Sequence, residues 1–272
     1  MKKLLFILSL TLITGISLVH AQTKEVRNVG TFTKISFRAP GKLYLRQGSP
    51  QKVELEGKKD VLQEIETDLE GSRLVIGPKG NWSGWKWGDD DEITVYITVK
   101  DIEGISVSGS GDVIGQTKIT AGDLDLNVSG SGNLNIDADA SGEVDADVSG
   151  SGDLNLKGKC REFNSDVSGS GKVNLTINIA EEAEFGISGS GKIEASGTAA
   201  TVKASISGSG KVLASNLETN RIEVRISGSG DVEINVKNEI DANISGSGTV
   251  SYKGNPSKVN SHSSGSGSVK KM

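Results

Sequence analysis

The chain has 272 residues, a formal net charge of -5, 36 glycines, 4 prolines and 1 cysteine. Hydrophobic residues make up 35% of it, which excludes a fully disordered chain, and the few prolines exclude a collagen-like one. The acidic balance argues against nucleic acid as a partner, because nucleic-acid-binding modules gather Lys and Arg on one face. Only 4% of the residues are aromatic, so the core has to be built from aliphatic side chains.

The N-terminal segment 1–21 has the form of a secretory signal peptide. Two lysines open the segment, an apolar stretch runs from Leu4 to Val19, and the compact Ala21 precedes a predicted cut before Gln22. A membrane anchor is the alternative, but the apolar run is shorter than the ~20 residues that span a bilayer. No later segment is apolar enough to cross a membrane as a helix. We therefore expect an exported protein in the periplasm, on the outer surface or outside the cell.

The dominant pattern is the tetrapeptide Ser-Gly-Ser-Gly, which recurs nine times at nearly even intervals. Its copies begin at Ser108, Ser129, Ser149, Ser168, Ser188, Ser207, Ser227, Ser245 and Ser264. A flexible Gly/Ser linker has the same letters, but a linker has no reason to hold apolar residues at fixed offsets. Val or Ile precedes eight of the nine copies, and Val, Leu or Ile stands two positions after every copy. A period of this length indicates a solenoid.

Strand periodicity assigns the two sides of each repeat. From Val128 to Ile136, alternation places Val128, both motif glycines, Leu134 and Ile136 inside and the serines and asparagines outside. Inward glycines suit a narrow interior or a corner that needs positive φ. The outward serines are expected to stack from coil to coil.

These patterns predict an all-β parallel β-helix of about 20 residues per coil, each coil holding two or three short strands. We divide the chain into a signal peptide (1–21), an N-terminal cap with degenerate first coils (22–105) and a β-helix with nine Ser-Gly-Ser-Gly repeats (106–272), the last two forming one continuous solenoid. Phe37–Leu45 aligns with Val128–Ile136 and is interpreted as an early coil. Further strands are expected at Lys52–Glu56, Arg73–Ile76 and Glu92–Val99, with a helical turn near Val61–Ile65.

The order of these segments resembles a known family. A signal peptide, the opening Phe32–Phe37 (FTKISF), the strand Leu74–Ile76 (LVI) and the entry Ile105–Gly111 (ISVSGSG) are similar to bacterial proteins called "putative auto-transporter adhesin, head GIN domain". The resemblance covers nearly all of the mature chain. It implies a right-handed parallel β-helix, export from a Gram-negative bacterium into the cell envelope, and an adhesin role.

Catalytic chemistry has few candidates in the sequence. His262 is the only histidine of the predicted mature chain, and no motif places a nucleophile beside it. No Gly-rich segment continues into Gly-Lys-Ser/Thr, so no phosphate loop is predicted. We predict no catalytic residues and no cofactor. Cys160 has no partner for an internal disulfide and is interpreted as a small buried hydrophobe, with a reactive thiol as the alternative.

The position that follows each repeat is the place to look for a calcium site. Three of these nine residues are acids (Asp112, Asp153, Asp231), three are lysines (Lys172, Lys192, Lys211), and the rest are neutral. Lysine at a ligand position repels a cation, and the period is far from that of the nonapeptide calcium β-roll. We predict no metal site.

The candidate binding residues are Trp82, Trp85, Lys86 and Trp87. All three tryptophans of the chain stand here, in a Gly-rich segment between Pro78 and an acidic run. Exposed rings in a loop stack on sugars or anchor a protein partner. The alternative is that the loop buries its rings as a lid on the solenoid.

Together these features predict an exported, non-enzymatic, adhesin-like binding protein that recognises an extracellular glycan or an envelope protein. A polysaccharide lyase or hydrolase built on a β-helix is the alternative from another class, and a purely structural envelope protein is the third.

Overall fold

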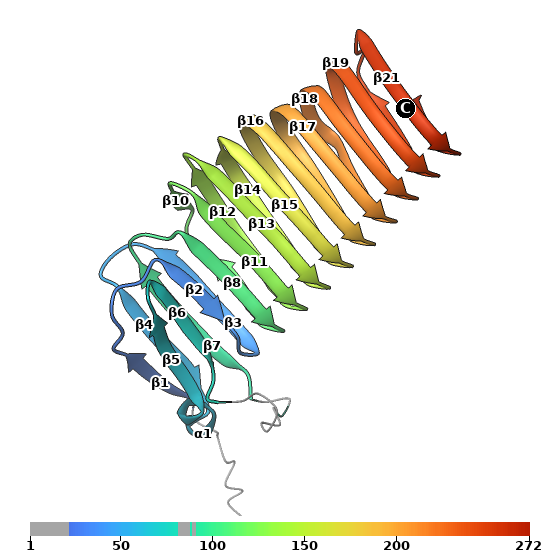
Figure 1. Ribbon diagram of the computed structural model, residues 1–272. Helices are drawn as coiled ribbons and strands as arrows, with labels where there is room; N and C mark the ends of the chain where they lie inside the picture. The colour runs from blue at the N-terminus through green and yellow to red at the C-terminus, as the bar shows by residue number, and fades with distance from the viewer. Residues whose placement is uncertain (1–21, 81–87, 89–90) are drawn as a thin grey trace, which may run out of the picture.

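The computed structural model describes residues 22–80, 88 and 91–272. Its strands wind into a β-solenoid, in which each coil has one strand before the Ser-Gly-Ser-Gly corner and one after it (Figure 1). The predicted all-β parallel solenoid is confirmed. We call the surface formed by strands that lead into the corner face 1, and the surface formed by strands that leave it face 2.

Face 1 is built from strands that pair in parallel from coil to coil: β8 (Gly104–Gly109), β11 (Leu124–Gly130), β13 (Glu143–Gly150), β15 (Glu162–Gly169) and β21 (Lys258–Gly265). Face 2 contains β9 (Asp112–Gly115), β10 (Ile119–Ala121), β12 (Asn133–Ala140), β14 (Asp153–Cys160), β20 (Thr249–Lys253) and β22 (Ser268–Lys271). Four long strands bend from face 2 onto face 1: β16 (Lys172–Gly189), β17 (Lys192–Gly208), β18 (Lys211–Gly228) and β19 (Asp231–Gly246).

The two glycines of each corner are required for different reasons. The first has a positive φ in every copy, such as +122° at Gly189. The second glycine lies where a side chain would point into the interior of the rod. A Cβ on Gly191 would stand 2.4 Å from Cγ1 of Val167 in the preceding coil. Both roles predicted for glycine, positive φ and a crowded interior, are therefore present at the same corner.

Inward aliphatic residues stack in register and fill the rod. The residue before the corner forms one such ladder, in which Val128 pairs with Val148, Val148 with Val167 and Val167 with Ile187. Their exposed fractions are 3% or less. The first serines of the motif form the matching outward ladder, since Ser129, Ser149, Ser168 and Ser188 also pair in sequence. The predicted assignment of faces is confirmed.

The N-terminal coils are stacked in a different order from their order in the chain. β2 (Lys34–Phe37) and β3 (Gly41–Gln47) form a coil against β8 and β9, with Phe37 opposite Val107 and Leu43 opposite Val113. The coil made by β6 (Arg73–Pro78) and β7 (Ile93–Val99) follows in sequence but lies on the outer side of β2 and β3. The predicted early coil at Phe37–Leu45 is confirmed. The sequence pattern does not predict that the coil of β6 and β7 lies outside the coil of β2 and β3.

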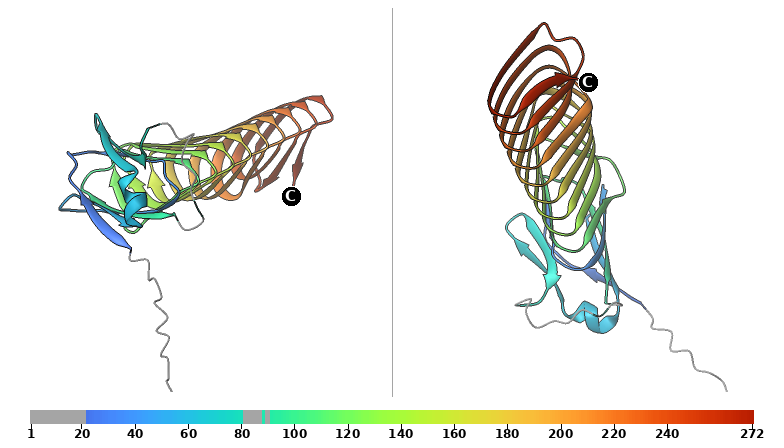
Figure 2. Two further views of the ribbon diagram at one scale, coloured as in Figure 1. Left: turned by 90° about the horizontal axis from the view of Figure 1, so that it is seen from below. Right: turned by 90° about the vertical axis from the view of Figure 1, so that its right-hand side faces the viewer.

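Antiparallel strands and one short helix cover the outermost coil. β4 (Lys52–Gly57) pairs with β7, β1 (Thr23–Arg27) pairs with β4, and β5 (Ile65–Glu70) pairs with β6. Helix α1 (Lys59–Gln63) buries Val61 and Leu62 at this end of the rod, opposite the C terminus (Figure 2). It begins and ends two positions before the turn that the sequence predicted.

Cys160 lies inside the solenoid, where it is 5% exposed and pairs in register with Ile179. Burial raises the pKa of its thiol to about 12. Almost none of it is therefore thiolate at neutral pH, as the interpretation of a small buried hydrophobe requires. In the part of the chain that the structure describes, no helix is long and apolar enough to cross a membrane.

Candidate functional site

The outward side chains of both faces form straight rows along the rod. Each row takes one residue from every coil, and neighbouring strands lie about 4.8 Å apart. A row therefore presents polar groups at a fixed spacing on a rigid backbone. Where small residues or an irregular strand interrupt the rows, the surface is hollowed into grooves.

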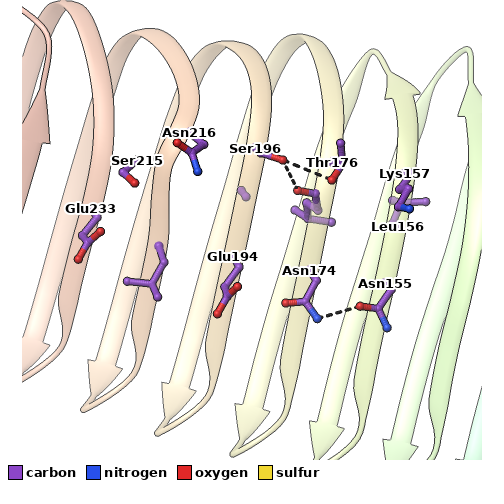
Figure 3. Close-up of a pocket in the computed structure, with 13 residues that line it drawn as sticks. Asn155, Leu156, Lys157, Asn174, Thr176, Glu194, Ser196, Ser215, Asn216 and Glu233 are labelled. Carbon is purple, nitrogen blue, oxygen red and sulfur yellow. Dashed lines mark hydrogen bonds between the residues drawn. The ribbon is translucent and has the colours of Figure 1, made fainter.

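The first groove lies on face 2 and has a volume of about 430 Å³. It runs across β14, β16, β17, β18 and β19, and its lining is mainly amide, hydroxyl and charged side chains (Figure 3). We call it the face-2 groove, and its residues are Asn155, Leu156, Lys157, Asn174, Leu175, Thr176, Glu194, Ala195, Ser196, Leu213, Ser215, Asn216 and Glu233.

Two ladders of polar side chains form the floor of the face-2 groove. Asn174 donates from Nδ2 to Oδ1 of Asn155 across 2.8 Å, which orders both amides (Figure 3). In the next row, Oγ of Ser196 lies 3.1 Å from the carbonyl oxygen of Leu175 and 3.3 Å from Oγ1 of Thr176. These side chains are held by their neighbours before any ligand arrives, so binding costs little rotamer entropy.

An irregularity in β18 forms one wall of this groove. Between Ala214 and Glu218, β18 advances four positions while β19 advances one, from Ile234 to Asn235. Of the extra residues, Ser215 and Asn216 line the groove, whereas Leu217 stays in the core. The hollow therefore exists because one coil is longer than the next.

The charges of the face-2 groove lie along its edges. Glu194 forms an ion pair with Lys192, with 3.3 Å between Oε1 and Nζ. Glu194 and Glu233 occupy the same row two strands apart, with Leu213 between them, so their backbones are about 10 Å apart. Amides, hydroxyls and carboxylates suit a ligand rich in hydroxyl groups, and two carboxylates across a groove also occur in glycoside hydrolases.

The second groove lies on face 1 and is acidic. It has a volume of about 620 Å³ and is lined by Asp145, Asp147, Asp166 and Glu184, among others. Gly186 has no side chain, and Oδ1 of Asp166 occupies the space where its Cβ would stand. Burial raises the pKa of Asp147, and the nearby carboxylates of Asp166, Asp145 and Asp125 raise it further, against a hydrogen bond from the Asp166 amide. Among the described residues no cluster of His, Cys, Asp and Glu has the form of a metal site.

The arrangement of repeats matches one protein family over most of the chain. The family model "Putative auto-transporter adhesin, head GIN domain" matches residues 31–191 and 173–256. The chain belongs to this head GIN domain family. No curated protein matches the chain.

Solved structures of similar fold include proteins from two Parabacteroides species. A "putative lipid binding protein" of Parabacteroides distasonis is 22% identical, with a TM-score of 0.69 and coverage of 92% of this chain and 96% of its own. A "putative adhesin" of the same species is 18% identical, with a TM-score of 0.70 and coverage of 93% and 98%. A "putative adhesin" of Parabacteroides merdae is 19% identical, with a TM-score of 0.70 and coverage of 92% and 96%. At such identities the likeness concerns the fold.

The site that the sequence predicts for this head GIN domain protein, at Trp82, Trp85, Lys86 and Trp87, lies outside the described residues. Its flanks are described. β6 ends at Pro78 and β7 begins at Ile93, and these two strands belong to face 1 and face 2. Asp91 accepts a hydrogen bond from the Gly88 amide and pairs with Lys58 just before α1, and these two contacts lower the pKa of the Asp91 carboxyl.

Sequence reasoning missed the face-2 groove, although two signals were present. The third residue after the corner is asparagine in three successive coils, at Asn135, Asn155 and Asn174. The repeat interval is then shorter between Ser227 and Ser245 than between Ser207 and Ser227. Such a step in length indicates extra residues in one coil, and therefore a bulge beside the asparagine row.

Proposed function

We propose that this protein is an exported, non-enzymatic, adhesin-like module that binds an extracellular glycan through the face-2 groove. The observation that carries the proposal is the floor of that groove, where hydrogen-bonded amides and hydroxyls stand in fixed rows on a rigid sheet. Sugars present closely spaced hydroxyl groups, and each amide offers both donors and an acceptor to them.

Two further features support the proposal. The family and two of the solved structures of similar fold carry the name adhesin. The segment 1–21 has the composition of a signal peptide, which fits a protein that meets glycans outside the cytoplasm. One relative is named a lipid-binding protein. An acyl chain, however, requires an apolar cleft, and the amide and hydroxyl floor of this groove favours a ligand with many hydroxyl groups.

A glycan array probed with the mature chain tests this function. For the glycan that binds, the N155A/N174A variant is expected to bind more than tenfold more weakly, because two hydrogen bonds of about 1 kcal/mol each are lost. N133A is the matched control: it removes an exposed asparagine of the same face that hydrogen-bonds Asp112 outside the groove. An array without any signal overturns the proposal and favours a protein partner or a structural role.

Product analysis on the same glycan separates binding from catalysis. Glu194 and Glu233 are the carboxylates that a hydrolytic alternative would use, because both line the groove in the same outward row. Intact oligosaccharide after long incubation is the expected result. Shortened products that disappear in the E194Q/E233Q variant would replace the binding function by a glycosidase.

The tryptophan segment is proposed as a second contact for the ligand. Three rings can remove a few hundred Å² of apolar surface from water, at roughly 25 cal/mol per Å². We therefore expect the W82A/W85A/W87A variant to lose affinity for the array glycan while its melting temperature stays unchanged. A large fall in melting temperature would instead identify the tryptophans as a structural lid.

A further inference from the structure

A third groove lies on face 1 beside the N-terminal cap and differs from the others in charge. Its volume is about 320 Å³, and its lining includes Lys34, Ser36, Arg38, Arg73, Ser106 and Asp125. These residues come from β2, β6, β8 and β11, which lie side by side (Figure 1). We call it the basic groove.

One end of the basic groove is formed where three strands begin. Lys34 pairs in register with Arg73 on one side and with Gly104 on the other. Because Gly104 has no side chain, the Lys34 stem lies across it, and Nζ reaches Oδ2 of Asp125 at 2.7 Å. The Lys34 charge is thereby neutralised, whereas Arg73 beside it has no carboxylate partner among the described residues.

The other end is formed by Arg38, which follows β2. Its Nε donates to Oγ of Ser36 across 3.2 Å, so the side chain folds back along the groove. Ser36 is 3% exposed although it lies on the outward side of the sheet, and with Ser106 it forms the floor. Lys34 and Arg38 are four positions apart, which is about 13 Å along an extended strand.

The arginine contacts show that this positive charge is unusual in the molecule. Four of the seven arginines, Arg27, Arg161, Arg221 and Arg225, form ion pairs with glutamates. Of the three that have no carboxylate partner in the described part of the chain, Arg38 and Arg73 line one groove, and Arg46 stands apart on face 2. An acidic protein of net charge -5 thus keeps two guanidinium groups without an ion pair in the described part of the chain at one hollow, with Glu70 opposite Arg73 in register on the side away from Lys34.

We propose that the basic groove binds an acidic glycan segment, a sugar chain that carries carboxylate or sulfate groups. Guanidinium groups bind such oxyanions with paired hydrogen bonds, and the serine floor hydrogen-bonds sugar hydroxyls. Arg73 and Arg38 come from neighbouring segments along the groove, so a chain that carries acidic groups on successive units can contact both of them. The site is on the face opposite the face-2 groove and does not depend on the function proposed there.

Titration calorimetry with oligogalacturonate tests the proposal, with its methyl ester as the neutral probe. The mature wild-type chain is expected to bind the acid and not the ester, with affinity that falls as NaCl is added. The R38Q/R73Q variant is expected to bind at least tenfold more weakly. The matched control is R46Q/K42Q, which removes the same charge from exposed side chains of face 2 that line none of the three grooves.

Each other outcome counts against the site. An equal loss of affinity in R38Q/R73Q and R46Q/K42Q would mean nonspecific attraction. Full displacement by equimolar inorganic phosphate would mean a small-ion site, and binding to phosphatidylglycerol vesicles without binding to oligogalacturonate or dextran sulfate would mean a lipid surface. If R38Q/R73Q binds oligogalacturonate as tightly as the wild type, the basic groove is not the binding site. The glycan that binds the face-2 groove should bind this variant normally, so the two proposals fail separately.

A second variant tests the same groove by a gain of affinity. D125N removes the only acidic side chain of its lining and frees the Lys34 ammonium. Oligogalacturonate is therefore expected to bind D125N several-fold more tightly than wild type. Equal or weaker binding would contradict the proposed position of the ligand.

Discussion

At the scale of single residues, the corner glycines determine which sequences can form this rod. The inward glycine of most corners stands against two groups of the preceding coil, a β-branched side chain and a glycine carbonyl. Serine, alanine or any other residue at that position has to displace both. The repeat therefore keeps glycine for a steric reason, while its serines lie outward and are free of this constraint.

We expect G191A to destabilise the protein by about 1–3 kcal/mol, because its new methyl group overlaps Val167 and the carbonyl oxygen of Gly171. This corresponds to a fall of roughly 3–10 °C in melting temperature, measured by circular dichroism. G122A is the control, since a Cβ there meets nothing within 4 Å and φ is not positive. Equal melting of G191A and wild type would contradict the close packing of successive coils.

At the scale of strands, the acidic row on face 1 makes stability depend on pH. Burial is the largest cause of the raised pKa of Asp147, and the carboxylates of Asp166 and Asp145 add to it. The folded protein therefore prefers the protonated form. The contribution of Asp147 to the stability of the fold is complete below the pKa of an unfolded aspartate, which is near 3.9. It is lost as the pH rises through the higher pKa of Asp147 in the folded protein.

D147N should consequently raise the melting temperature at pH 7 and leave it unchanged near pH 3. The asparagine carbonyl can still accept the hydrogen bond that the Asp166 amide gives to Oδ1 at 3.1 Å. Scanning calorimetry at both pH values measures the effect, with D137N, an exposed aspartate on face 2, as the comparison. Stabilisation by D147N that is the same at pH 3 and pH 7 would mean that the effect is not electrostatic.

The strands also show how far the sequence alone leads. Fixed offsets around Ser-Gly-Ser-Gly predict the strands, the inward ladders and the register of Phe37 with the later valines, because each coil repeats the same local pattern. The position of β6 and β7 outside β2 and β3 depends on pairing between distant segments, and no local pattern encodes it. The basic groove was missed for the same reason, since Arg38 and Arg73 come to line one groove only through that pairing.

At the scale of the whole molecule, the two ends of the rod differ from its sides. The four exposed large hydrophobic side chains of the described residues all lie at the ends: Val26, Leu69, Val259 and Met272. The N-terminal end has a helix and antiparallel strands over its core, whereas the last coil, β21 and β22, pairs on one side only. The sides carry grooves of different charge, such as the acidic groove and the basic groove on face 1, so the position along the rod decides which ligand is bound.

The direction of the hydrogen bonds between coils has a mechanical consequence. Bonds such as that from the Ser190 amide to the Gly169 carbonyl, 2.9 Å long, join one coil to the next and so lie along the rod. Tension between the two ends stretches these bonds lengthwise, and a coil with a neighbour on one side only is the first to peel away. A ligand bound in the face-2 groove pulls on the coils that form this groove, between β14 and β19. If the N-terminal end of the rod is held, the tension passes through the coils between that end and the groove. The last coil, β21 and β22, lies beyond the groove and carries none of the tension. The strand edge that is easiest to open then lies beyond the loaded part of the molecule.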